Sequence, residues 1–317
     1  MSKQGLRKIY IERLIELAAT DDRIVSLDTD SQEATMADKF AAAYPERAFT
    51  FGIAEQDMVS AAGGMATMGL VPFVNSYSMF IAMRALDQVR NSIAYPNLNV
   101  NFVLSHHGLD AGADGVTHQL TEDIAIFRSI PNLVYLSPAD AVEMRQMVDF
   151  AISYDGPVVI KSGKTMQQDV HGEDHIWKLG VPSILAKGDT VAIAATGIMV
   201  AEALVAKEKL TGLGINARVV NVSTLAGVDD DALLDVFAGC ELVISMEDHS
   251  IHGGLGGLLA ELFSERRPTR LIRLGLRDTF AECGPPADLY RKYEMDSDAA
   301  VNRVKGLLDE IPDLLSN

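Results

Sequence analysis

Short apolar runs and stretches of helical periodicity alternate along most of this chain. Apolar runs bounded by polar or turn-forming residues predict strands at residues 24–27, 48–51, 71–74, 100–104, 133–136, 157–160, 190–194, 217–221, 242–245 and 271–274. Apolar residues at helical spacing predict helices at residues 5–20, 36–44, 55–69, 78–94, 122–128, 139–153, 199–210, 230–237, 253–263 and 299–308. This alternation predicts an α/β fold with mostly parallel sheets and helices on both faces.

The alternation lapses once, in a polar stretch that contains His171, His175 and the only tryptophan, Trp177. We interpret residues 165–189 as the linker between domains. It separates two doubly wound domains, residues 1–164 and a smaller domain of residues 190–317. Ligands of such sheets bind beyond the carboxyl ends of the strands, so the loops after Phe51, Leu104 and Ile160 are the places to search for chemistry.

Composition narrows the class of protein. The 317 residues suffice for two ordinary domains, and 48% hydrophobic with 22% charged residues is typical of a soluble protein. A net charge of −17 argues against non-specific nucleic-acid binding, which needs cations. An apolar run of membrane-spanning length and a signal-peptide core are both missing, and two cysteines do not make a disulfide framework. These features predict a cytoplasmic protein without membrane or nucleic-acid partners.

Glu55 begins a helix of small and apolar residues directly after a predicted strand. A carboxylate in such a dry place must be hydrogen-bonded to the fold or held for a ligand, because burial without a partner is costly. Capping of the helix start is the simpler alternative, since acids are favoured there. The two interpretations both stand at this point.

The next strand is followed by Tyr77 and Phe80, three residues apart on one helical face. They form either an aromatic wall of a site or ordinary core. The loop from Ser105 to Gln119 then crowds His106, His107 and His118 with two acids and three glycines. A zinc site from these histidines is conceivable, but their spacing matches no recognised ligand pattern. Polar contacts and proton transfer to a hydroxylated substrate fit better.

Three further segments invite weaker hypotheses. The pair Lys161 and Lys164 after a strand is either an anion site or a solvated surface pair. The glycines of residues 253–257 match no phosphate-binding fingerprint and are better explained by a tight turn and close helix packing. The acids of residues 247–250, placed after the strand at 242–245, are expected to cap the helix that follows.

Three of these motifs together resemble the transketolase-like thiamine diphosphate enzymes. The run from Phe51 to Met58 resembles their glutamate motif, and residues 113–119 resemble their Asp-Gly-x-Thr-His-Gln loop. Residues 246–249 and the glycine-rich helix start resemble their C-terminal domain. The Gly-Asp-Gly motif with which the family binds the diphosphate through Mg²⁺ is not found. The chain therefore looks like the pyrimidine-binding and C-terminal domains of a split transketolase whose diphosphate-binding domain is a separate partner polypeptide.

The resemblance implies roles for several residues. Glu55 would be catalytic and would hydrogen-bond N1′ of the cofactor's aminopyrimidine, which favours the imino tautomer that removes the thiazolium C2 proton. Phe80, Tyr77 and Met83 fall at cofactor-side positions, although Met83 stands where some members carry an aromatic residue. Positions that contact the substrate's hydroxyls or its phosphate end correspond to His106, Asp114, His118 (also given a catalytic role), Lys164 and Arg7. None of these residues is predicted to bind metal; Mg²⁺ would be held mainly by the partner.

Two departures concern the substrate. Ala113 replaces an acid that is common before Asp-Gly, and Lys164 in place of arginine loses the bidentate fork that suits phosphate. The far end of the substrate is thus open between phosphate, sulfonate and another group. The sugar, the partner and the pathway are likewise open.

The function implied is transfer of a two-carbon ketol unit from a ketose, usually phosphorylated, to an aldose, within a heterotetramer built with the partner subunit. The beta subunit of a 2-oxo acid dehydrogenase is the nearest enzyme alternative, and a fragment of a 1-deoxyxylulose-5-phosphate synthase is another. A non-catalytic partner subunit is the alternative from a different class.

Overall fold

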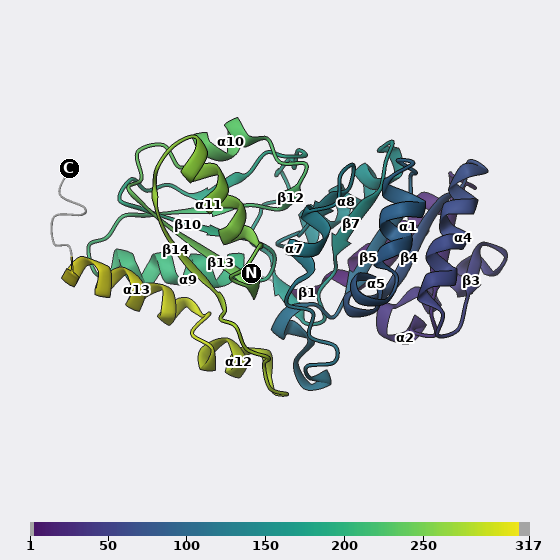
Figure 1. Cartoon of the computed structure of the whole chain (residues 1–317), viewed down its shortest axis with the longest axis horizontal. Coiled ribbons are helices and arrows are strands. Elements are labelled where there is room, and N and C mark those ends of the chain that lie inside the picture. The colour runs from purple at the N-terminus through teal and green to yellow at the C-terminus, as the bar shows by residue number, and fades with distance from the viewer. Residues whose placement is uncertain (1–2, 311–317) are drawn as a thin grey trace.

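Two twisted sheets of mainly parallel strands, each covered by helices, make up the computed structural model, which describes residues 3–310 (Figure 1). The doubly wound α/β architecture predicted from the alternation is thereby confirmed. The two lobes lie side by side, with the N-terminal half at one end of the long axis and the C-terminal half at the other (Figure 1).

The first lobe holds a seven-stranded sheet in the order β12-β6-β7-β5-β4-β2-β3, in which all pairs except β12 with β6 are parallel. Its strands are β2 (Ile24–Asp28), β3 (Ala48–Thr50), β4 (Val71–Tyr77), β5 (Asn101–Ser105), β6 (Val134–Leu136), β7 (Val158–Lys161) and β12 (Thr224–Ala226). Its helices are α1 (Leu6–Ala18), α2 (Gln32–Thr35), α3 (Ala37–Ala43), η1 (Pro45–Arg47), α4 (Glu55–Thr67), α5 (Ser78–Arg84), α6 (Leu86–Gln88), η2 (Val89–Ala94), η3 (Gly108–Asp114), α7 (Asp123–Arg128) and α8 (Ala141–Ser153).

The second lobe holds a five-stranded sheet in the order β14-β13-β10-β11-β9, with only β9 antiparallel. Its strands are β9 (Ser183–Ala186), β10 (Val191–Ala195), β11 (Ala217–Asn221), β13 (Leu242–Ser250) and β14 (Arg270–Leu276). Its helices are α9 (Met199–Thr211), α10 (Asp230–Asp235), α11 (Leu255–Glu265), α12 (Pro286–Lys292) and α13 (Ser297–Glu310).

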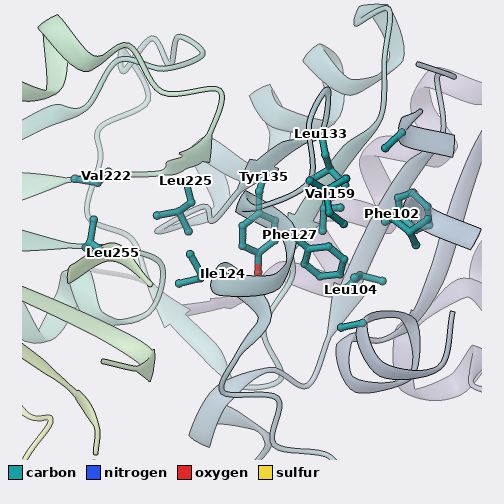
Figure 2. Close-up of a cluster of buried hydrophobic side chains, with 14 of the residues drawn as sticks. Phe102, Leu104, Ile124, Phe127, Leu133, Tyr135, Val159, Val222, Leu225 and Leu255 are labelled. Atoms are coloured by element: carbon teal, nitrogen blue, oxygen red, sulfur yellow. The ribbon is translucent and has the colours of Figure 1, made fainter. Parts of the chain in front are cut away.

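Alternate residues of each central strand face opposite cores, as the pleat requires. Phe73 and Val103 pack with α1 and α8 on one face of the first sheet. Val74 and Phe102 pack with α4 and α5 on the other. This second core continues into the C-terminal lobe, and Figure 2 shows it passing from Phe102 through Phe127, Tyr135 and Leu225 to Leu255. The two lobes therefore share one hydrophobic core.

Three segments differ from the pattern-based expectation. The supposed linker contains two strands, β8 (Met166–Gln168), which pairs with β1 (Lys3–Gly5), and β9, which pairs with β11. The helix expected at residues 78–94 is divided into α5, α6 and the π-helical η2. The strand expected to end at residue 245 continues to Ser250, so its acids lie within β13 rather than after it.

One of those acids behaves as expected. Glu247 accepts hydrogen bonds from the backbone amides of Leu255, at 2.6 Å, and Gly256, at 2.9 Å, in the first turn of α11. The glycines there do serve close packing, because a Cβ on Gly254 would stand 1.9 Å from the Glu247 carboxylate. Burial raises the pKa of Glu247 to about 7, although these two amide donors work in the opposite direction.

Asp248 connects the lobes through buried hydrogen bonds. Its carboxylate accepts from the backbone amides of Leu109, at 2.7 Å, and Asp110, at 3.0 Å, and from the hydroxyl of Tyr290 at 2.9 Å. Gly108 has φ of +55°, and a Cβ there would lie 2.3 Å from the Asp248 carboxyl carbon. The glycine-rich loop of the first lobe is thus built around a carboxylate of the second. No helix within residues 3–310 is long and apolar enough to span a bilayer.

We expect Asp248→Asn to lower the free energy of unfolding by about 1–3 kcal/mol, because an amide group cannot accept from both backbone donors and leaves one of them buried and unpaired. Urea unfolding of the full chain at pH 7.5 measures the effect. Asp231→Asn is the matched control, since Asp231 is exposed and pairs with Arg266 at the surface. Equal unfolding midpoints for the two variants would show that the Asp248 contacts do not hold the lobes.

Candidate active site

The sequence-predicted site residues gather at one edge of the first sheet. Glu55 follows β3, Tyr77 ends β4, His106 follows β5 and Lys164 lies just beyond β7. These four strands are parallel members of the same sheet, so their carboxyl ends meet at a single edge. Loops at this edge are where doubly wound sheets bind ligands.

Glu55 is the first residue of α4 and is only 4% exposed. Within residues 3–310, no hydrogen bond or ion pair of its carboxylate is recorded, including to the amides of its own helix. Two apolar residues shortly before Glu55 are exposed to solvent. Ile53 is 80% exposed, and Phe49, on the edge strand β3, is 37% exposed. A sheltered, unpartnered carboxylate thus lies beside exposed apolar side chains.

Four rings form a cluster at the end of β4. The Tyr77 ring meets His106 edge-on at 4.1 Å between centroids, and meets Phe80 at 5.5 Å and His118 at 5.4 Å. Phe80 and His118 are 5.5 Å apart. Tyr77, Phe80 and His118 are all half-buried rather than enclosed in the core, so the cluster has an accessible side.

Charged groups border these rings. The Asp114 carboxylate lies 2.7 Å from the Lys164 ammonium and 3.4 Å from Nε2 of His106. Burial works to raise the pKa of Asp114, but Lys164 outweighs it and the pKa is lowered. Arg7 donates to the backbone carbonyl oxygens of Ala34 and of Lys164, the latter at 2.8 Å. Arg7 and Lys164 are distant in sequence, and this hydrogen bond brings the two residues next to each other.

His106 is held neutral. Burial, reinforced by the positive charges of Arg7 and Lys164, lowers its pKa to about 3. Its Nδ1 lies 2.8 Å from the hydroxyl of Ser105. A neutral imidazole offers one donor and one acceptor, which suits contact with a hydroxyl group.

Sequence reasoning missed Asp110, which is fully buried and organises the same loops. Its carboxylate accepts from the backbone amides of Lys164 and Thr165 and from the Thr165 hydroxyl. Its own amide donates to Asp248. Gly163, with φ of +56°, makes the turn that brings these amides together. The only sequence signal was an acid inside a glycine-rich loop.

The structure contradicts two of the sequence-based hypotheses, those for Lys161 and for a zinc site made by three histidines. Lys161 is neither a solvated residue nor a free anion site, because it is buried and pairs with Asp123 at 3.0 Å. His106, His107 and His118 do not form a trio of converging ligands; the one such trio that the described residues contain lies elsewhere. His107 is enclosed in the core, where burial holds its pKa well below the usual range.

The structure does not bring every predicted residue to the ring cluster. Met83 is 53% exposed on α5, and no ring contact or hydrogen bond joins Glu55 to the cluster within residues 3–310. The strand order places β2 between β3 and β4, so the ends of β3 and β4 are two strand spacings apart, about 10 Å.

Comparison with known proteins gives a consistent result over the whole chain. The family model of the transketolase pyrimidine binding domain matches residues 2–167, and that of the transketolase C-terminal domain matches residues 180–299. The resemblance noted in the sequence is thereby confirmed.

Individual relatives match over nearly their full lengths. A protein of Methanocaldococcus jannaschii described as the C-terminal section of a transketolase is 38% identical over 95% of both chains. The 6-deoxy-6-sulfo-D-fructose transketolase subunit SqwH of Clostridium sp. (strain MSTE9) is 40% identical over 92% of this chain and 91% of its own. A solved split-gene transketolase, described as an inactive β4 tetramer, superposes with a TM-score of 0.89 at 37% identity, covering 96% of this chain and 99% of its own.

The neutrality of His106 predicts a pH dependence of stability. Its folded pKa lies below the unfolded value of about 6.5, so as the pH falls from 7 to 5 the unfolded chain takes up a proton that the folded chain does not, and stability is lost. Between pH 7 and pH 5, we expect the free energy of unfolding of His106→Gln to fall by about 1–2 kcal/mol less than that of the parent chain. Urea unfolding at both pH values measures this difference. The same loss in both proteins would contradict the assignment.

Proposed function

This chain belongs to the transketolase family, and we propose that it is the C-terminal subunit of a thiamine diphosphate-dependent transketolase carried on two polypeptides. Its reaction moves a two-carbon ketol unit from a ketose to an aldose. Support comes from the two relatives and the solved structure that match end to end, each of them described as a section, a subunit or a split-gene product of a transketolase.

The observation that carries the proposal is the carboxylate of Glu55, buried and unpartnered at the sheet edge where ligands bind. Leaving such a group without a hydrogen bond is costly, so its retention is explained by a ligand that supplies the bond. The pyrimidine ring of thiamine diphosphate fits this requirement, since it offers a ring nitrogen at its edge and flat faces for aromatic contact. Phe80 and Tyr77 provide aromatic surface of that kind.

The cofactor, once bound, supplies the nucleophilic carbon and the electron sink. The residues of this chain would bind and orient the cofactor's pyrimidine ring. Glu55 would share a hydrogen bond with the pyrimidine nitrogen at this sheltered edge. Tyr77 and Phe80 would keep the ring in position by aromatic contact.

The substrate is proposed to lie over the ring cluster. Neutral His106, together with His118, would contact its hydroxyls, and we assign the movement of a proton to His118, the more accessible of the two. Asp114 orients Lys164 through their ion pair. Arg7 and Lys164 place two positive charges at the far end, which favours an anionic terminus such as a phosphate or a sulfonate.

A partner subunit completes this site. The diphosphate and Mg²⁺ are proposed to be held mainly by the partner, which carries the diphosphate-binding domain. Phe49, Ile53 and Met83 are exposed apolar residues around the Glu55 edge, as expected of a surface that another chain covers. We propose a cytoplasmic heterotetramer, and the unpaired Cys240 and Cys283 suit a reducing compartment.

We expect Glu55→Gln to lower the turnover of the reconstituted complex by about 10²–10⁴-fold, the range for removal of a general acid–base group. Transfer from xylulose 5-phosphate to ribose 5-phosphate, with partner and cofactor present, measures it. Asp57→Asn is the matched control, because Asp57 lies in the same first turn of α4 but is exposed. A Glu55→Gln complex as active as the control would indicate a scaffold subunit and defeat the proposal.

Substrate choice separates the enzyme alternatives. The complex is expected to accept xylulose 5-phosphate as donor and to be inactive with pyruvate, and the chain alone is expected to be inactive with both. Turnover of pyruvate would favour a 2-oxo acid dehydrogenase beta subunit or a synthase of 1-deoxyxylulose 5-phosphate instead. A coupled spectrophotometric assay of each donor with and without the partner gives the answer.

A further inference from the structure

A second group of titratable residues lies outside the candidate active site, where the segment between the lobes meets α8 and β11. Glu143 projects from the first turn of α8, and His171 and His175 come from the segment that the sequence pattern left unassigned. One ligand atom from each of the three lies within 4.8 Å of the other two. None of these residues has a role in the proposed reaction.

Glu143 is a buried carboxylate, only 1% exposed. Its Oε2 accepts from the backbone amide of Ala139 at 2.8 Å, and its Oε1 accepts from the side-chain amide of Asn221 at 2.8 Å. Both donors are neutral, so they fix the orientation of the carboxylate without neutralising its charge. A buried charge of this kind calls for a cation.

His175 faces this carboxylate without bonding to it. Its Nε2 is buried, has no hydrogen-bond partner among residues 3–310, and lies 3.8 Å from Oε1 of Glu143. That separation is too long for a hydrogen bond. Two metal–ligand bonds of about 2.0–2.1 Å each span up to about 4.1 Å, so an ion fits between the two atoms.

His171 is oriented as a metal-ligating histidine usually is. Its Nδ1 lies 2.9 Å from the carboxylate of Asp140, which also accepts the backbone amides of Val170, at 3.0 Å, and of His171 itself, at 2.7 Å. A carboxylate that takes the proton of one ring nitrogen fixes the tautomer and leaves the lone pair of the other for a metal. That Nε2 lies 3.3 Å from the hydroxyl of Ser183.

The two imidazoles stack, with centroids 3.8 Å apart and planes 21° from parallel. Two imidazolium ions would repel at this distance, and a shared metal ion would remove that repulsion by binding a lone pair of each ring. Two imidazoles and one carboxylate form a donor set that suits zinc and similar divalent transition metals.

We propose that Glu143, His171 and His175 bind one divalent transition-metal ion of the zinc class, with a water molecule as the fourth ligand. The ion fastens the inter-lobe segment to α8, and through the Glu143–Asn221 hydrogen bond to β11 of the second lobe. It is a structural site that is separate from the proposed transketolase chemistry, and its test does not use activity.

The experiment uses the full chain without an affinity tag, stripped with EDTA and then dialysed against Zn²⁺ or Co²⁺. We expect about one retained equivalent of zinc by elemental analysis, visible d–d absorption bands with Co²⁺, and a rise of a few degrees in the melting temperature on adding Zn²⁺. His175→Gln should lose all three effects, and Glu143→Gln should weaken them while the neutral amide keeps the bulk of the side chain. His252→Gln, which removes an exposed histidine elsewhere, should behave as the parent chain.

Three results would overturn the proposal. They are the absence of Co²⁺ bands in the folded parent chain, equal zinc retention by the parent and His175→Gln, and a loss of zinc in His252→Gln alone. The first would mean that His171 is simply held by Asp140 and that the trio binds no ion. Because metal binding is measured on the parent chain itself, poor folding of one variant does not decide the outcome.

Discussion

The structure depends on buried carboxylates that accept backbone N–H groups from distant parts of the chain. Asp248, in the second lobe, receives the amides of Leu109 and Asp110 in the first. Asp110 in turn receives the amides of Lys164 and Thr165. This relay sets the conformation of both loops that carry the charged residues of the site, because each loop is held by the side chain of another segment rather than by its own regular structure. Each carboxylate is kept from water yet satisfied by several donors, which is the condition under which burying a charged group is tolerated.

Much of the fold follows from local pattern alone. The central strands carry apolar residues on both faces, and this is a property of short sequence windows, so the parallel sheets and most helices could be predicted. The misses have a common cause. Strands β8, β9 and β12 are three or four residues long and exist because of partners far away in the chain: β8 pairs with β1, some 160 residues earlier, and β12 pairs with β6. The segment holding His171 and Trp177 looked unstructured because it is held by distant residues, namely Asp140 at the start of α8, Gln146 within α8, and Ser223.

The contrast between local pattern and distant partners also explains which site residues could be predicted. Glu55, Tyr77 and Phe80 could be singled out because each lies in a motif directly after a predicted strand, and the sheet topology places those strand ends together. The roles of Asp110 and Asp248 could not be predicted, and Asp248 does not cap α11 as expected, since an acid that accepts amides up to 139 residues away has no local signature. Lys161 was misjudged for the related reason that its partner, Asp123, lies in a helix 38 residues earlier, and only tertiary packing shows that the pair is buried. Sequence pattern thus locates residues that act from their own loop, and it overlooks residues that act on another loop.

Strand β12 bears on how such a chain could be divided or recombined. It comes from the second half of the polypeptide yet completes the sheet of the first, beside β6. A cut between residues 168 and 183 that removed the second half would bare the edge of β6, and an unpaired strand edge is a template for aggregation. It would also open the hydrophobic core that Leu225 and Leu255 close (Figure 2). The two halves consequently depend on each other to cover this strand edge and this core.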